Sequence, residues 1–203
     1  TGAPIAGGMK RHADSARTPR NGAGIYRSFN LGTMSTKTVV RAPAVTKLST
    51  DVSFAAAAIV GCGVMTGWGS AVNVAQVTPG SVAVVLGCGG VGLNVIQGAR
   101  VSGATTIIGV DPKESRRAMA LEFGATHVLD PGDNDPGLLN TADIVKTMTD
   151  GLGAHYAFEC TALPSLRAAP LALIRHGGMA GAGSGSAAET HSAQRPVPSR
   201  KTR

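Results

Sequence analysis

Three glycines with the spacing G-x-G-x-x-G follow a short apolar run near the middle of the chain. They are Gly87, Gly89 and Gly92, directly after the run VAVVL. In such a pattern the first glycine lets the chain turn off a strand, the second lets a phosphate approach the backbone, and the third lets a helix pack close to the sheet. The first turn of that helix offers free N–H groups to phosphates. The spacing therefore predicts a pyrophosphate-binding loop.

A carboxylate stands where an adenosine ribose would need it. Asp111 follows a second apolar run, TTIIGV, and lies 19 residues after Gly92. A carboxylate there can accept hydrogen bonds from both ribose hydroxyls and would repel a 2′-phosphate, which favours NAD over NADP. A glycine-rich strand–helix–strand unit without a ligand is the alternative. It is disfavoured because the loop and the acid occur together and in the right order.

Composition indicates a core of small and branched apolar residues. The chain has 203 residues, of which 43% are hydrophobic but only 3% aromatic. Ala, Val, Ile and Leu must therefore fill the interior, which suits a parallel sheet covered by helices. The length allows one full domain and part of another.

Charge is concentrated at the two ends of the chain. Residues 1–47 carry a net +7 and residues 187–203 a net +3, whereas residues 48–186 carry −3. The ends have few aromatic residues, so we expect them to be solvated and do not predict nucleic-acid binding. The three cysteines are odd in number and widely spaced, which indicates a reducing, cytoplasmic location, and no signal peptide is recognisable.

One stretch is apolar enough to imitate a membrane span. No charged residue occurs from Val52 to Ala99, and 21 of these residues read VSFAAAAIVGCGVMTGWGSAV. That length would cross a bilayer. Because the stretch contains four glycines and leads into the glycine motif, we predict instead a buried helix and loop of a soluble protein, with no membrane partner.

Strand and helix patterns alternate through the second half of the chain. Residues 1–30 look loop-like, residues 36–48 predict strand, turn and strand around Pro43, and the sequence after residue 182 predicts a flexible tail. Between them we expect strands at 82–86, 106–110, 127–129 and 155–160, with a weak one at 178–182. We expect helices at 53–60 (ending at Gly61), 66–74, 91–102, 113–123, 138–149 and 164–175. This alternation predicts an α/β fold with a doubly wound parallel sheet of about five strands.

With these motifs in place, residues 31–178 resemble the zinc-containing alcohol dehydrogenases of the medium-chain dehydrogenase/reductase superfamily, in particular a bacterial class III-like branch. The segments that carry the resemblance occur in the same order as in the family; they are GTMSTKTVV, GCGVMTGWGSAVNVAQVTPGS, GCGGVGLNVIQGAR, IIGVD and FGATHVLDP. The resemblance implies a Rossmann-type NAD-binding domain at 63–186 and a partial β-rich catalytic-domain remnant at 1–62. Composition and charge predict a flexible basic tail at 187–203.

The resemblance also implies roles for individual residues. Cys62 matches a cysteine ligand of the family's catalytic zinc, Thr66 lies beside the nicotinamide ring, and Val91 backs that ring. Asp111 matches the acid that binds the adenosine ribose, and Arg116 a basic residue at the same ribose. The cofactor-binding set is Thr66, Gly87, Gly89, Gly90, Val91, Gly92, Asp111 and Arg116. In such enzymes zinc polarises the alcohol oxygen and a hydride passes to the nicotinamide.

The metal site that the resemblance implies is incomplete in this chain. Catalytic zinc needs about three protein ligands, and the family's other ligands come from upstream of the residues present. We therefore expect a chain truncated at both ends, with zinc bound in the complete parent enzyme, itself expected to be a homo-oligomer, but not held by Cys62 alone. No residue here is predicted to be catalytic.

Three functions are left open by the sequence. The first is an alcohol dehydrogenase-like oxidoreductase that transfers a hydride between a small alcohol or aldehyde and NAD, present as an incomplete chain. The second is a vestigial NAD-binding module without catalysis, or a misfolded remnant. A methyltransferase shares a glycine turn and an acid after the next strand, but the segments quoted above argue against it.

Overall fold

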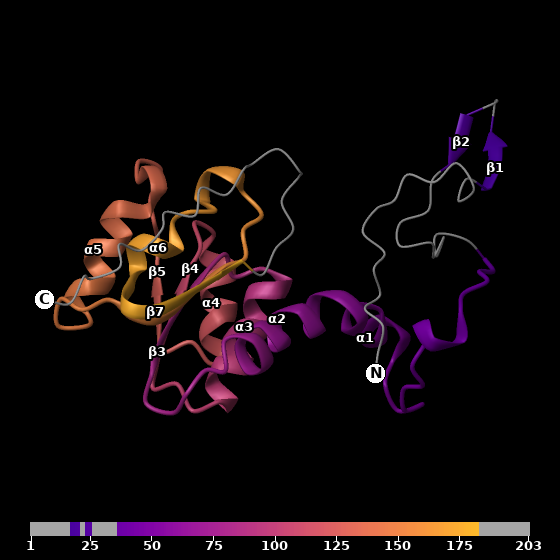
Figure 1. The fold of residues 1–203 in the computed structure, drawn as a ribbon, viewed down its shortest axis with the longest axis horizontal. Coiled ribbons are helices and arrows are strands. Elements are labelled where there is room, and N and C mark those ends of the chain that lie inside the picture. The colour runs from indigo at the N-terminus through magenta and orange to yellow at the C-terminus, as the bar shows by residue number, and fades with distance from the viewer. Residues whose placement is uncertain (1–16, 21–22, 26–35, 183–203) are drawn as a thin grey trace, which may run out of the picture. The chain divides into compact units, whose positions relative to one another are not determined.

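The computed structural model describes residues 17–20, 23–25 and 36–182, and the chain divides into two compact units, Thr1–Val52 and Ser53–Arg203 (Figure 1). In the first unit, β1 (Arg17–Arg20) and β2 (Ala23–Ile25) pair antiparallel. The loop-like composition of residues 1–30 did not predict this hairpin. The predicted tail at 187–203 lies outside the described residues.

The strand–turn–strand prediction for residues 36–48 is wrong. This segment contains a 3-10 helix, Ala42–Ala44, and no strand. Pro43 lacks a backbone N–H and favours the tight turn. Nearly all residues of the segment are exposed, so its valines have no apolar layer against which to form a half-buried strand.

Five parallel strands form the sheet of the second unit, in the order β5-β4-β3-β6-β7. They are β3 (Val82–Leu86), β4 (Thr106–Val110), β5 (His127–Leu129), β6 (Ala154–Glu159) and β7 (Ile174–Ala182). The predicted doubly wound parallel sheet is confirmed. The central strand β3 lies between β4 and β6, so the loops that follow these three strands open at the same edge of the sheet.

Helices cover both faces of this sheet (Figure 1). They include α3 (Gly90–Val101), α4 (Glu114–Glu122), α5 (Leu139–Thr147) and α6 (Pro170–Leu173). Alternate residues of β3 point to opposite faces: Val85 joins the core beneath α3, whereas Val84 joins the core beneath α5. Both residues are fully buried.

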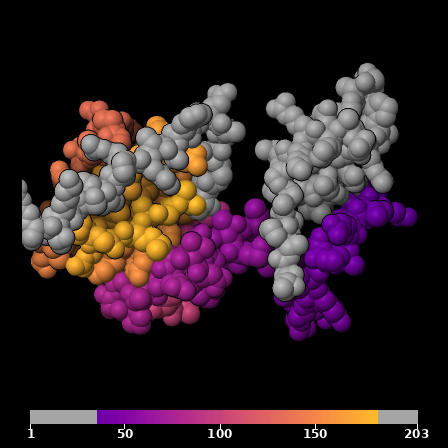
Figure 2. Space-filling model, viewed as in Figure 1, coloured from indigo at the N-terminus to yellow at the C-terminus, as the bar shows by residue number. Residues whose placement is uncertain are grey.

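The prediction of a helix over 164–175 is wrong in extent. Only a 3-10 turn (Pro164–Leu166) and the four-residue α6 form there. Pro164 and Pro170 lack the N–H groups that a continuous helix would use. The weak strand expected at 178–182 begins earlier, at Ile174; β7 has nine residues and pairs with β6 from Ile174 to Ala182, with a register shift in between. Much of β7 is exposed, and Figure 2 shows it (yellow) on the surface.

The apolar stretch before β3 forms one long helix. It comprises α1 (Phe54–Ile59), α2 (Met65–Gly69) and π-helical turns at Val60–Val64 and Ser70–Val74. Ser53 caps its start, accepting a hydrogen bond from the N–H of Ala56 at 3.2 Å. The predicted end at Gly61 is wrong, because the π-helical turn carries the chain through this glycine.

The two halves of this helix have different surroundings. In the second half Gly67 lies against α3, so close that a Cβ on it would meet the carbonyl oxygen of Val91 at 2.2 Å. In the first half Phe54 is 98% exposed and Ile59 is 59% exposed. The prediction that this stretch is buried is therefore wrong for most of its length. Figure 1 shows α1 extending away from α3.

By length and composition this helix would also cross a membrane. Residues Phe54–Val74 have a mean hydropathy of 1.5, and 11% of the stretch is buried. One such helix is weak grounds for a membrane protein, because core helices of soluble proteins meet the same criteria.

His155, at the start of β6, contacts the amino-terminal ends of the two neighbouring strands, β3 and β7. Its Nδ1 accepts the N–H of Val82 at 3.0 Å, and its Nε2 lies 2.8 Å from Nη1 of Arg175. The Val82 N–H is a donor, so this contact needs an unprotonated Nδ1, which the neutral ring provides and the protonated ring does not. Burial and the nearby Arg175 guanidinium lower the pKa of His155 below its usual value.

This lowered pKa predicts that the fold loses stability in mild acid. The unfolded chain binds a proton at His155 more readily than the folded chain, so the free energy of unfolding should fall as the pH drops from 7 through 6.5 toward the lowered value. Thermal unfolding followed by circular dichroism between pH 7.5 and 5.0 checks this. The fall in Tm should be shallower in His155→Gln, and unchanged in His176→Gln, whose side chain is exposed. Parallel pH profiles for wild type and His155→Gln would contradict the prediction.

Candidate dinucleotide-binding site

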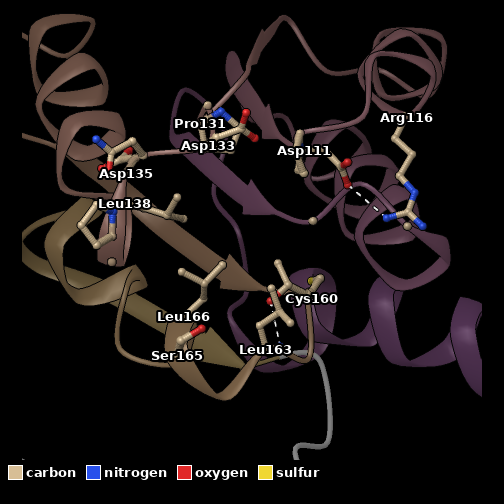
Figure 3. A pocket seen from close by; sticks show the side chains of 18 residues that line it. Asp111, Arg116, Pro131, Asp133, Asp135, Leu138, Cys160, Leu163, Ser165 and Leu166 are labelled. Atoms are coloured by element: carbon tan, nitrogen blue, oxygen red, sulfur yellow. Dashed lines mark hydrogen bonds and ion pairs between the residues drawn. The ribbon is translucent and has the colours of Figure 1, made fainter.

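A cavity of about 910 Å³ opens at the edge of the sheet where β3, β4 and β6 end (Figure 3). The loops after β3, β4 and β5 form one side of it, and the segment after β6 forms the other. The lining residues are Gly87, Gly89, Asp111, Pro112, Arg116, Pro131, Gly132, Asp133, Asn134, Asp135, Pro136, Gly137, Leu138, Cys160, Thr161, Leu163, Ser165 and Leu166.

The glycine loop turns sharply off β3 and leads into α3. Gly87 has φ +86°, which favours glycine, and its N–H donates to the carbonyl oxygen of Val110 at 2.8 Å. Cβ atoms placed on Gly89 or Gly90 would have no neighbour within 4 Å. The backbone at the start of α3 is thus open to a ligand, and N–H groups at a helix start bind phosphate.

Asp111 is held in one orientation beside this loop. Its carboxylate is almost fully buried, with Oδ2 accepting the N–H of Cys88 at 3.0 Å and Oδ1 accepting that of Lys113 at 2.9 Å. Nη1 of Arg116, a half-exposed side chain, lies 3.5 Å from Oδ2. Asp111 and the glycine loop therefore share one cavity, with the carboxylate already oriented and Arg116 at its rim (Figure 3).

The loop after β5 adds acidic residues that sequence reasoning did not assign to the site. Asp133 and Asp135 line the cavity. The Asp135 carboxylate accepts the N–H groups of Asn140 and Thr141, each at 2.8 Å, and so fixes the start of α5. Burial tends to raise the pKa of Asp135, but the bonds from Thr141 and Asn140 outweigh it and lower the pKa. Loops after parallel strands gather at one edge of a sheet, but the sequence did not show that β5 lies next to β4.

The segment after β6 forms the opposite wall and was also missed. Cys160, Thr161, Leu163, Ser165 and Leu166 line the cavity there. In Figure 3, Cys160 and Leu163 lie across the opening from Asp111. This wall is mostly small or apolar, in contrast to the acidic side.

Five of the predicted site residues lie outside the cavity lining. Gly90 and Gly92 belong to the first turn of α3. Val91 packs against the core on that face of the sheet. Thr66 is exposed in α2, where its carbonyl oxygen accepts the Ser70 hydroxyl at 2.7 Å. Cys62 is exposed in the long helix.

The described residues do not fit a zinc site. Cys62, the predicted ligand, is exposed, and no group of three or more His, Cys, Asp or Glu side chains that would hold a metal occurs in the described ranges. A catalytic zinc needs about three protein ligands. No step of the chemistry is therefore assigned to a metal held by this part of the chain.

The three cysteines should differ sharply in reactivity. Burial, followed by the charge of Asp111, raises the pKa of the Cys88 thiol to about 12. Burial, followed by the charge of Glu159, raises that of Cys160 to about 12 as well. Iodoacetamide at pH 8 should therefore label the exposed Cys62 and leave the other two unmodified, because the thiolate is the nucleophile. Peptide mass mapping checks this, and labelling of Cys160 before Cys62 would contradict it.

The chain is similar in sequence to zinc-dependent dehydrogenases. The profile of the zinc-binding dehydrogenase family matches residues 90–201. Over 142 residues the chain is 41% identical to S-(hydroxymethyl)glutathione dehydrogenase from Paracoccus denitrificans, covering 70% of this chain and 38% of that protein. It is 40% identical over 143 residues to a class-3 alcohol dehydrogenase from Cereibacter sphaeroides, with the same coverage.

Solved structures agree with these relatives. The crystal structure of benzyl alcohol dehydrogenase from Acinetobacter calcoaceticus matches with a TM-score of 0.73 and 32% identity, covering 83% of this chain and 45% of that one. The chain thus spans less than half the length of the proteins that it matches. The family profile covers more than half of its residues, and the resemblance seen in the sequence is confirmed: the chain belongs to the zinc-binding dehydrogenase family, among the zinc-containing alcohol dehydrogenases of the medium-chain dehydrogenase/reductase superfamily.

Proposed function

We propose that this chain binds NAD in the cavity at the ends of β3, β4 and β6, as the cofactor-binding part of an alcohol dehydrogenase. The observation that carries the proposal is the shared cavity of Asp111 and the glycine loop, with the carboxylate held by the N–H of Cys88 at 3.0 Å. Asp111 would bind the adenosine ribose, assisted by Arg116, and the open backbone at Gly89 and Gly90 would bind the pyrophosphate. Val91 and Thr66 would lie toward the nicotinamide.

The charges around the cavity favour NAD over NADP. Asp111, Asp133 and Asp135 all line it, and Arg116 is the only Lys or Arg among the lining residues. Arg116 lies beside the Asp111 carboxylate. A 2′-phosphate on the ribose would face these carboxylates, and like charges at close range cost binding free energy. NADPH should therefore bind at least ten times more weakly than NADH.

The reaction of the complete enzyme would be hydride transfer between NAD and a small alcohol or aldehyde. Its relatives include an S-(hydroxymethyl)glutathione dehydrogenase and a class-3 alcohol dehydrogenase. The nicotinamide of the cofactor accepts the hydride. In this chain the protein's part is to bind and orient that cofactor, and we place it in the cytoplasm with a small-molecule substrate.

A second candidate function is NAD binding without catalysis. It is favoured by the exposure of Cys62 and by the lack of a three-ligand cluster in the described part of the chain. Residues 63–186 would then form a domain that still binds the cofactor, and residues 1–62 would be the remnant of a catalytic domain. Alcohol-dependent reduction of NAD by the 203-residue chain, with zinc supplied, separates the two functions.

Direct titration tests the proposed cofactor. NADH fluorescence is followed as the 203-residue chain is added, and NADPH and S-adenosylmethionine are then used as competitors. We expect saturable NADH binding, weak competition by NADPH and none by S-adenosylmethionine. An absence of binding at millimolar NADH would refute the proposal, and preferential binding of S-adenosylmethionine would point to a methyltransferase instead.

A further inference from the structure

A buried carboxylate ends β6 beside the cavity, and the site described above gives it no role. Glu159 is 2% exposed. Its Oε1 accepts three hydrogen bonds from the residues that follow: the N–H of Thr161 at 2.5 Å, the Thr161 hydroxyl at 2.5 Å and the N–H of Ala162 at 3.1 Å. A single oxygen thus organises the turn at residues 160–163, here called the β6 turn.

The β6 turn needs such an anchor. Ala162 has φ +61°, in the left-handed region, which is strained for a residue with a Cβ. The Thr161 hydroxyl also accepts the N–H of Leu163 at 3.0 Å, so the Glu159 oxygen, the hydroxyl and the next amide form a chain of bonds. Three hydrogen bonds accepted by one buried oxygen stabilise the turn and can offset the strain at Ala162.

The β6 turn also touches the glycine loop. The Cys160 N–H donates to the carbonyl oxygen of Leu86 at 2.8 Å. A Cβ on Gly87 would lie 2.9 Å from Cγ2 of Thr161 and 3.1 Å from its nitrogen. The turn and the loop therefore fix each other's position.

The order of the strands shows which part of a dinucleotide this turn would meet. Asp111 follows β4, the glycine loop follows β3 and the β6 turn follows β6, and these strands are neighbours in that order. Given the proposed binding of NAD, with the adenosine ribose at Asp111 and the pyrophosphate at the glycine loop, the second nucleotide extends over the end of β6. Thr161 and Leu163 of the β6 turn line the cavity there.

We propose that Glu159 is a positioning residue for NAD: through one acceptor oxygen it holds the β6 turn in the shape that binds the nicotinamide half of the cofactor. This inference deepens the proposed function and depends on it. It concerns Oε1 as an acceptor, because Oε1 receives the three bonds that shape the β6 turn.

The experiment compares NADH with AMP, which contains only the adenosine half. Dissociation constants of both are measured for the full 203-residue chain and for Glu159→Ala, Glu159→Gln and Glu159→Asp. Gln keeps an acceptor oxygen at the same reach, whereas Asp keeps the charge but is one methylene shorter. Val145→Ala, a truncation of a buried residue in α5, controls for loss of stability alone, and circular dichroism verifies that each variant is folded.

We expect Glu159→Ala and Glu159→Asp to weaken NADH binding about tenfold and AMP binding less than twofold. Glu159→Gln and Val145→Ala should bind both ligands within twofold of wild type. Unchanged NADH binding by Glu159→Ala, equal losses for NADH and AMP, or a Gln variant as weak as the Ala variant would each overturn the inference.

If Glu159→Ala does not fold, the Asp and Gln variants decide in the same way. A wild-type chain that binds neither ligand refutes the proposed function itself, whereas wild-type binding with indifferent Glu159 variants refutes only this inference.

Discussion

Asp111→Ala should weaken NADH binding by about 100-fold. A carboxylate that accepts two ribose hydroxyls contributes about 3 kcal/mol, since hydrogen bonds to charged groups contribute about 1.5 kcal/mol or more each. The same substitution should lower the Tm, because the N–H groups of Cys88 and Lys113 lose their acceptor within the fold. Fluorescence titration with NADH and thermal unfolding measure the two effects separately.

Two further variants make this result specific. Asp111→Asn keeps an acceptor oxygen and nearly the same shape, so it should retain most of the Tm but still lose about tenfold in NADH affinity. Asp143→Ala removes an exposed carboxylate of α5 that pairs with Lys146, and it should change neither quantity. NADH affinity of Asp111→Ala within threefold of wild type would show that this acid does not contact the ribose.

Gly92→Ala should destabilise the fold by about 3 kcal/mol or more. A Cβ at this position would lie 1.9 Å from the carbonyl oxygen of Gly87 and 3.3 Å from Cγ1 of Val85. The Gly87 oxygen belongs to the backbone of the turn that lines the cavity, so it cannot rotate aside as a side chain could. Overpacking of this kind costs about 1–3 kcal/mol or more. Urea unfolding monitored by circular dichroism gives the free energy of unfolding.

Gly90→Ala, two residues earlier in α3, is the matched control. Its Cβ would meet nothing within 4 Å, and alanine is preferred over glycine in a helix by about 0.5–1 kcal/mol. We expect its free energy of unfolding to equal or slightly exceed that of wild type. If Gly92→Ala were as stable as Gly90→Ala, the close approach of α3 to the glycine loop would be wrong.

The sheet was largely predictable because its strands carry local signals. The strands at 82–86, 106–110 and 127–129 have the predicted bounds, since each apolar run is short and ends at a glycine or a polar residue. Burial on both faces produces such continuous runs. The family resemblance supplied the same order of elements, and the comparisons confirm the family.

The segments that were wrongly predicted depend on neighbours that local pattern does not reveal. Residues 36–48 contain short β-branched runs on either side of Pro43 that are typical of strands, but no strand forms there. Gly61 looks like a helix end, yet a π-helical turn passes through it. The apolar stretch that contains Gly61 looked like a buried helix, but only its second half packs on α3. Hydropathy indicates which side chains a segment could bury, but not whether another element packs against them.

The cavity was predictable at one wall only. Asp111 and the glycine loop were found because their spacing follows from strand length and helix length, which are local properties. The acidic loop at Asp133 and the turn held by Glu159 required knowledge of which strands are neighbours. Arg116 entered through the family resemblance, and the structure places it among the lining residues. The roles of Thr66 and Val91 stay predictions.

The two ends of the long helix before β3 should differ in local stability. The second half of the helix packs on α3, at Gly67 and again at Ala71, whereas the exposed Phe54 and Ile59 contribute little to holding the first turns. Hydrogen exchange in such a helix proceeds by local opening at the unbraced end and by wider unfolding at the braced end. We therefore expect the amides of the first turns, at Phe54–Ile59, to exchange faster than those around Gly67.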